Sequence, residues 1–494
     1  MHASRSAPSS ARPTATDACT GRICPVWHGV VIVPVSTSPQ AAGRAASPSS
    51  LLSGGRRPAA HVSIGGSMSR SRSVITTTVG VAAVGALLAM AGCAPAPQST
   101  PTAQPTPSES ATPDPYAGPL DFVGDELDWF LPAAAEIADM LPSVGDVSAP
   151  SSSLIAISDG GGPVASPAAC NALLAEAALG SVGARTITWT TAARPERDGW
   201  LHVLQFADEA AAQARMDQYA QAADQCVEFE YEDASSFVSS SAEGEGGVRA
   251  IAGSLTVPRG SDDGWNQYKG YASVGNVIVS FWQPFGGEPD FDTAQAAALL
   301  RDRASEARAM LIDELTANPP TPAPTPAAAD PSAPWGEWEI SAAGVGPVPL
   351  GVDVAEAIAA VPGAHVEESD WGGPTRLIAA DGSASLLLWA DDDDVVSGIS
   401  VGAANVSGDR THDGAALPAA GGVRVGDPVS AAIAAFPEGT TSRVVSSGEF
   451  FYESASRDGI TLRFRADREA TDPAAVITGI LVEDAKLRTP LNFG

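Results

Sequence analysis

Side chains that could act as general bases are scarce in residues 93–494. Three histidines occur there, His202, His365 and His412, and an enzyme nucleophile needs a base beside it to become reactive. His202 falls on a predicted strand, where a packed or edge histidine is expected, and the other two fall in predicted loops. No His-Glu-x-x-His or Ser-x-x-Lys pattern and no Lys-containing phosphate loop occurs. The sequence therefore predicts no catalytic residue and no enzyme, with a hydrolase that uses carboxylates as an alternative.

The densest acidic run, Asp391 to Asp394, is the strongest candidate for metal binding. Hard cations prefer six or more oxygen ligands from several directions, which four successive aspartates in one turn rarely supply. We therefore expect a solvated turn, with a calcium site as the alternative. No metal site and no other cofactor is predicted.

Aromatic side chains gather around one predicted hairpin. The group consists of Trp265, Tyr268, Trp282 and Phe285. Core packing is the simpler interpretation of such a group, and stacking against a sugar or a peptide is the alternative. Trp265, Tyr268 and Trp282 are the candidate ligand-binding residues.

A different chemistry, lipid attachment, is indicated at Cys93. Arg70 and Arg72 precede Val79 to Met90, an uncharged apolar run that is shorter than the roughly 20 residues of a membrane-spanning helix. The next residues, Ala91-Gly92-Cys93, resemble a bacterial lipobox, although Met90 stands where Leu is usual. The resemblance implies a lipid on the Cys93 thiol, cleavage before it, and a chain tethered to the outer face of the cell membrane. An ordinary cleaved signal and a short membrane anchor are the alternatives.

Composition shifts divide the chain into predicted segments. Residues 1–67 fit no downstream element and indicate a start assigned too early, with a disordered leader as the alternative. Residues 68–92 are the predicted signal peptide, 93–116 a Pro/Thr/Ser tether and 317–334 a Pro/Ala linker. Two folded domains are then expected, at 117–316 and 335–494.

Charge and cysteine content agree with an extracytoplasmic location. Eight of the 28 basic residues but one of the 58 acidic residues precede Cys93, which leaves 20 basic and 57 acidic residues from there on. Such a surface repels nucleic acid, so we expect no nucleic-acid partner. Cys170 and Cys226 are the two remaining cysteines, and in an oxidising compartment they most simply form one disulfide.

The first domain reads as α+β. Segments 186–191, 200–206 and 248–257 have strand composition, and 268–282 has that of a hairpin turning at Gly275-Asn276. Asp208 and Asp292 are placed to cap two helices. The second helix has an apolar seam of Leu300, Ala304, Ala307, Leu311 and Leu315. Strands and helices without regular alternation favour α+β.

This order resembles the PknH-like extracellular sensor domain of mycobacterial receptor Ser/Thr kinases and related lipoproteins. The resemblance rests on residues 131–137 (LPAAAEI), 167–170 (PAAC), 203–212 (VLQFADEAAA) and 274–279 (VGNVIV). It implies a twisted central sheet and a cleft proposed to bind a ligand. That family often has a second disulfide, which this chain lacks, and no kinase domain is present.

The second domain contains an internal repeat. Gly351 to Pro362 match Gly426 to Pro437 at an offset of 75 residues, and 397–401 match 478–482. The units, about 344–405 and 420–485, each read as a strand, a short helix and three strands. The pattern resembles the helix-loop-sheet repeat of β-lactamase-inhibitor-like and outer-envelope assembly lipoproteins, which implies a protein-binding surface.

These features together predict a lipid-anchored cell-envelope protein whose extracytoplasmic domains bind a ligand or a partner. Its expected partners are the membrane, through the lipid, and an unidentified envelope ligand or protein. An inhibitor or assembly factor that acts through the C-terminal repeat is the alternative.

Overall fold

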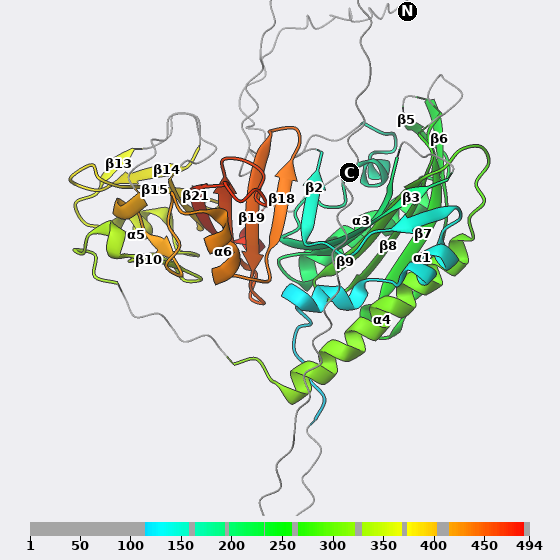
Figure 1. Ribbon diagram of the computed structural model, residues 1–494, viewed down its shortest axis with the longest axis horizontal. Coiled ribbons are helices and arrows are strands. Elements are labelled where there is room, and N and C mark those ends of the chain that lie inside the picture. Colours follow the sequence, from blue (N-terminus) through cyan, green and yellow to red (C-terminus); the bar gives the residue numbers. More distant parts are fainter. Residues whose placement is uncertain are drawn as a thin grey trace, which may run out of the picture. The chain divides into compact units, whose positions relative to one another are not determined.

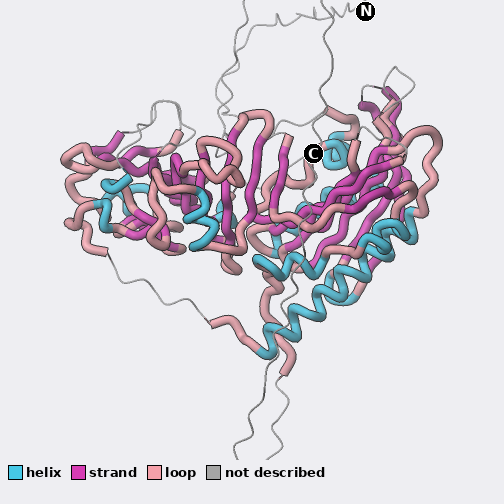
Figure 2. Tube along the Cα trace, in the orientation of Figure 1, coloured by secondary structure: helices cyan, strands magenta, loops and turns pink. Residues whose placement is uncertain are grey.

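The computed structural model describes residues 114–157, 164–192, 197–231, 233–258, 265–321, 329–367, 373–402 and 414–488. They form a mixed α+β structure with sheets of eight, four and nine strands (Figures 1 and 2). The α+β prediction is therefore confirmed. Cys93, the expected leader and signal, and the expected tether up to residue 113 lie outside the described residues. The last tether residue, Tyr116, packs against the core of the first domain, and its amide donates to Thr316 Oγ1 at 2.8 Å. No described helix is both long and apolar enough to cross a membrane.

The eight-stranded sheet is antiparallel and has the strand order β1-β3-β4-β9-β8-β7-β6-β5. Its strands are β1 (Val144–Val147), β3 (Gly183–Thr191), β4 (Gly199–Gln205), β5 (Phe229–Tyr231), β6 (Asp233–Glu243), β7 (Arg249–Thr256), β8 (Gln267–Val274) and β9 (Val277–Pro284). The turn between β8 and β9 lies at Gly275-Asn276, as expected. Gly275 has a φ of +53°, and a Cβ there would collide with the Leu120 carbonyl oxygen, so this turn requires glycine.

Two long helices lie against this sheet. Asp208 begins α3 (Glu209–Gln225) by accepting the Ala211 amide, and Asp292 begins α4 (Thr293–Ala317) by accepting the Gln295 amide. The predicted seam of α4 is buried throughout. Figure 1 shows α4 running beside the strands of the sheet. The shorter helices of this part are α1 (Ala134–Met140) and α2 (Asn171–Leu174).

The nine-stranded sheet contains the repeat and has the order β13-β14-β15-β16-β21-β20-β19-β18-β2. In each unit a helix precedes a four-stranded antiparallel meander, one strand more than expected, because the first strand of each meander is short. The first unit has α5 (Val354–Ala359), β13 (His365–Glu367), β14 (Thr375–Ile378), β15 (Ser385–Ala390) and β16 (Val396–Gly402). The second has α6 (Val429–Ala435), β18 (Thr440–Val444), β19 (Glu449–Ala455), β20 (Ile460–Ala466) and β21 (Ile477–Asp484).

The ninth strand of that sheet comes from the first predicted domain. The strand β2 (Ser153–Ala156) pairs in parallel with β18, and Thr440 Oγ1 accepts the Ala184 amide at 2.8 Å. Arg457 pairs with Glu126. The two expected domains therefore share a sheet, although the division at residues 317–334 stays a prediction.

The remaining elements are small. The four-stranded sheet has β10 (Glu339–Ser341), β11 (Gly344–Val345), β12 (Val348–Pro349) and β17 (Ala419–Ala420). Short 3₁₀ helices cover Gly124–Phe130, Ala168–Cys170, Glu245–Gly247, Trp335–Glu337, Gly414–Ala416 and Ala485–Leu487.

Candidate functional site

The eight-stranded sheet has two different faces. The face toward α4 belongs to an apolar core that includes Val203, Val279 and Phe281. The face toward α3 shares a second core with that helix through Tyr271 and Ile278. Because alternate residues of a strand point to opposite faces, the same strands can carry quite different layers. The α3 face carries polar and half-buried aromatic side chains beside its apolar core.

Three aromatic rings form a stack on the α3 face. Trp200 of β4 lies directly across from Trp282 of β9, with the ring centroids 6.0 Å apart and 13° between the planes. His202 stacks on Trp200 with the centroids 4.2 Å apart. Burial lowers the pKa of His202 to about 4, so this imidazole is neutral at ordinary pH. Both indoles are half-buried. Trp200 stacks with both other rings, so the outer face of Trp282 is the surface on which another ring could lie.

Lys269 of β8 places a cation beside this stack. It lies directly across from Trp282, so the two side chains share a face. Only 7% of Lys269 is exposed, and its ammonium donates to the carbonyl oxygen of Leu173 in α2 at 2.5 Å. In the described part of the chain, no carboxylate pairs with this ammonium. Burial lowers the pKa of Lys269 to about 7, because nothing nearby compensates the charge.

Polar atoms without partners lie on the same face. Gln267, two residues before Lys269, is fully buried, and among the described residues its amide oxygen and nitrogen both lack a hydrogen bond. Two further atoms also lack a hydrogen bond among the described residues. They are Nδ1 of His202 and Oγ1 of Thr186, the β3 residue directly across from His202. A buried polar group left unpaired costs about 1–3 kcal/mol, and native proteins contain few of them. Four such atoms, two of Gln267 and one each of His202 and Thr186, therefore lie on the α3 face.

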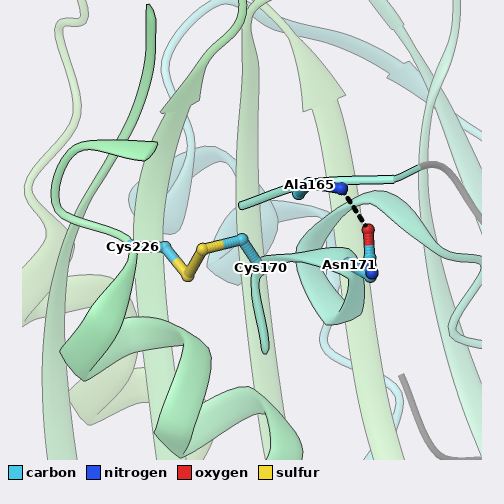
Figure 3. The surroundings of a disulfide bond; sticks show 4 residues. All are labelled: Ala165, Cys170, Asn171 and Cys226. Atoms are coloured by element: carbon cyan, nitrogen blue, oxygen red, sulfur yellow. Dashed lines mark hydrogen bonds between the residues drawn. A yellow bond between two sulfur atoms is a disulfide. The ribbon is translucent and has the colours of Figure 1, made fainter. Parts of the chain in front are cut away.

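The disulfide positions the helix that meets Lys269. Cys170 and Cys226 are joined, with their Cα atoms 5.7 Å apart, which links the start of α2 to the end of α3 (Figure 3). Asn171, the first residue of α2, accepts the Ala165 amide at 2.7 Å through its side chain. These contacts hold the Leu173 carbonyl against the strand β8.

The structure separates the three aromatic residues that were expected to bind a ligand together. Trp282 lies in the stack, and Trp265 is half-buried against the α3-side core. Tyr268 lies on the α4 face, where it stacks on Phe285 at 4.3 Å and its hydroxyl accepts the Asp290 amide at 3.0 Å. Tyr268 is therefore a core residue of the α4 face. Its neighbours in β8, Gln267 and Lys269, face α3, because adjacent residues of a strand point to opposite faces.

The other predicted residues lie away from this cluster. Asp391 to Asp394 form the turn between β15 and β16, and the Asp391 carboxylate accepts the amides of Asp393 and Val395. His365 is exposed on β13, 3.8 Å from Glu367, and His412 lies outside the described residues. Where the structure describes the chain, no three potential metal ligands come together.

The letters Gly-x-Ser-x-Gly do occur, from Gly398 to Gly402. In enzymes with this pattern the serine sits on a tight turn between a strand and a helix. Here Ser400 lies within the regular strand β16, between Leu387 and Leu481 of the neighbouring strands. Its hydroxyl accepts the Trp389 indole N–H at 3.2 Å. The pattern is therefore strand sequence and not a nucleophile elbow.

Sequence patterns alone predict no role for Lys269, Gln267 or Trp200. One signal points to Lys269: it and Lys486 are the two lysines after Cys93, and a lysine inside a buried strand is unusual. Trp200 and Trp282 pair because β4 lies beside β9. This is a long-range contact, and local periodicity does not predict it.

A small cavity occurs on the α4 side of the sheet. It has a volume of about 30 Å³ and is bordered by Leu201, Val279 and the ion pair of Arg303 with Glu136. This volume has room for about one water molecule. The cavity is therefore too small to be a ligand site.

Comparison with known proteins yields weak structural similarity. No protein-family model and no curated protein matches the chain. The extracellular domain of PknH from Mycobacterium tuberculosis is 14% identical, with 40% of this chain and 98% of that domain covered and a TM-score of 0.26. An uncharacterized protein from Mycobacterium smegmatis is 14% identical, with 37% and 97% covered and a TM-score of 0.20. Similarity at this level carries no argument about the function of this chain.

Proposed function

We propose that this protein is a lipid-anchored extracytoplasmic binding protein that holds a small molecule on the α3 face of its eight-stranded sheet. The site comprises Trp200, His202, Gln267, Lys269 and Trp282, and is named the stack site below. The observation that carries this proposal is the buried, uncompensated ammonium of Lys269 directly across from a half-buried indole.

The energetics of the stack site favour binding. Burying a charge without an ionic partner and leaving an amide unpaired both destabilise a folded chain. A bound molecule that hydrogen-bonds to Lys269 and Gln267 would recover that free energy. Natural proteins accept such losses of stability mainly where function requires them.

Catalysis is not proposed for the stack site. A base and a hydroxyl, those of His202 and Thr186, lie directly across from each other on this face. However, Nδ1 of His202 and Oγ1 of Thr186 both lack a hydrogen-bond partner among the described residues, so the two are not bonded to each other through these atoms. A nucleophile without a bonded base is not activated.

A binding experiment tests this proposal. Thermal unfolding of the exported full chain would be followed with a panel of sugars, organic acids, amines and short peptides. At least one compound should raise the melting temperature of the wild type but not of Trp282→Ala, while Tyr268→Phe on the opposite face should respond like the wild type. Compounds that stabilise all three proteins equally, or none of them, would contradict binding at the stack site.

The membrane anchor is part of the proposal and rests on the sequence around Cys93. Labelled fatty acid should enter the exported protein, and Cys93→Ala should abolish the labelling. Labelling that persists in the variant would refute the anchor and leave the stack site unaffected.

The alternatives gain less support. In the repeat, the half-buried rings of Phe450 and Phe451 already contact the guanidinium groups of Arg443 and Arg463, which makes them less available to a protein partner. Two buried carboxylates of the nine-stranded sheet are ion-paired and so are not free to act in a hydrolase: Arg488 bonds Glu483 at 2.6 Å, and Arg463 bonds Glu453 at 3.1 Å.

A further inference from the structure

We infer that the ligand of the stack site is a small organic acid, a carboxylate carried on a sugar or aromatic ring. This inference rests on the proposed function and deepens it by assigning the chemical class of the ligand.

Charge argues for an anion. The ammonium of Lys269 has three N–H groups and uses one of them, toward Leu173. The group that best compensates a buried ammonium is a negatively charged oxygen acceptor. No side chain of the described residues pairs with this ammonium, so an anionic ligand would supply the missing charge.

The number of charges argues for a carboxylate over a phosphate. Lys269 is the one cation of the stack site. The one basic residue of α3 is Arg215, which donates to the Leu179 carbonyl at 3.0 Å and lies over the Phe206 ring. One ammonium balances a single negative charge, and the strongly acidic chain around it disfavours an ion with two.

Geometry places a hydrogen-bonding amide within reach of the same group. Gln267 and Lys269 are alternate residues of β8 and face the same way, which puts their Cα atoms about 7 Å apart. One carboxylate can bridge such a gap by accepting from Nε2 of Gln267 and Nζ of Lys269. This arrangement would give Nε2 of Gln267 a hydrogen-bond partner and would compensate the charge of Lys269.

The neighbouring indole defines the rest of the ligand. Trp282 lies directly across from Lys269, and Trp200 stacks with Trp282 on the side away from Lys269. A ring attached close to the carboxylate would therefore lie on Trp282. Sugar rings and aromatic rings both stack on indoles, so the experiment includes one acid of each kind.

Matched pairs of probes test the inference. Binding of glucuronate and glucose, and of benzoate and benzamide, would be measured by calorimetry on the exported full chain. The variants are Lys269→Met and, as a control for loss of a lysine, Lys486→Met. The acid of at least one pair should bind about tenfold or more tightly than its neutral partner, since hydrogen bonds to charged groups have that strength. Lys269→Met should abolish the difference, and Lys486→Met should keep it.

Three outcomes would overturn the inference: equal affinity for acid and neutral partner, an unchanged preference in Lys269→Met, or no binding of either acid at millimolar concentration. Equal affinity that is lost in Trp282→Ala would leave the proposed function standing and refute the ligand class alone. Absence of any bound compound, here and in the wider panel, would refute both.

Discussion

Two glutamines in adjacent strands of one sheet have opposite environments. Gln283 of β9 faces α4, where its oxygen accepts the Trp189 indole N–H at 2.8 Å and its nitrogen donates to the Pro142 carbonyl at 2.7 Å. Gln267 of β8 faces α3 and makes neither bond. Both side chains are almost fully buried. At these two positions the α4 face pairs its buried amide, whereas the α3 face keeps polar atoms that stability alone does not explain.

The aromatic residues show the same contrast. On the α4 face Tyr268 is buried, and its hydroxyl has a partner in Asp290. On the α3 face Trp200 and Trp282 are half-buried and lie beside a cation. The sheet therefore has a closed aromatic core on one side, and on the other a half-buried aromatic layer that we propose binds a ligand.

The largest effect is expected from the disulfide, which supports the α3 face. The replacement Cys170→Ser with Cys226→Ser opens a loop with a sequence separation of 56 residues. In the chain-entropy model this lowers the free energy of unfolding by about 4 kcal/mol. Denaturant titration would measure it, and the wild type in reducing buffer, where the same bond is open, should show the same loss. A loss below about 1 kcal/mol would show that α2 is held by packing alone.

The two glutamines give the next effect. Gln283→Met leaves the Trp189 N–H and the Pro142 carbonyl unpaired and should lower the free energy of unfolding by about 3 kcal/mol. Gln267→Met removes two atoms that have no partners and should cost little or raise stability. Equal losses in the two variants, measured by denaturant titration, would abolish the distinction between the faces.

The pH dependence of stability tests the charge on the α3 face. The pKa of Lys269 is lowered to about 7 in the folded protein from an ordinary 10.5. Between these values the unfolded chain binds more protons, so this lysine makes the free energy of unfolding rise with pH. The rise should be about 2 kcal/mol between pH 7 and 9. Denaturant titrations at both pH values should show it in the wild type relative to Lys269→Met, and parallel curves would contradict it.

The smallest effect is expected on the α4 face at Tyr268. Tyr268→Phe keeps the stacking on Phe285 and removes one hydrogen bond from the Asp290 amide. The loss should be about 1 kcal/mol, with ligand binding at the stack site unchanged. A change in ligand affinity would mean that the two faces are not independent.

Local pattern was sufficient to predict several elements. The caps at Asp208 and Asp292, the apolar seam of α4 and the turn at Gly275 are all encoded within a few residues of sequence. The repeat was visible because Gly351 to Pro362 recur in Gly426 to Pro437. Periodicity and turn chemistry act over short distances, so such elements can be predicted from sequence.

Long-range pairings could not be predicted in this way. Asn276 was expected only as a turn residue, but its side chain bonds the backbone of Phe122 and Phe206. The parallel pairing of β2 with β18 crosses the predicted domain boundary. The stack site has the same character, because Trp200, Trp282 and Lys269 come together only once the order β4-β9-β8 exists.

The most direct test of this account is the stability of Gln267→Met combined with Lys269→Met, measured by denaturant titration at pH 6 without ligand. Methionine keeps a similar length and removes the amide and the charge. If the polar groups of the α3 face serve a ligand, the double variant should be at least as stable as the wild type. A free energy of unfolding lower by about 2 kcal/mol or more would show that these groups support the fold, and would contradict the account.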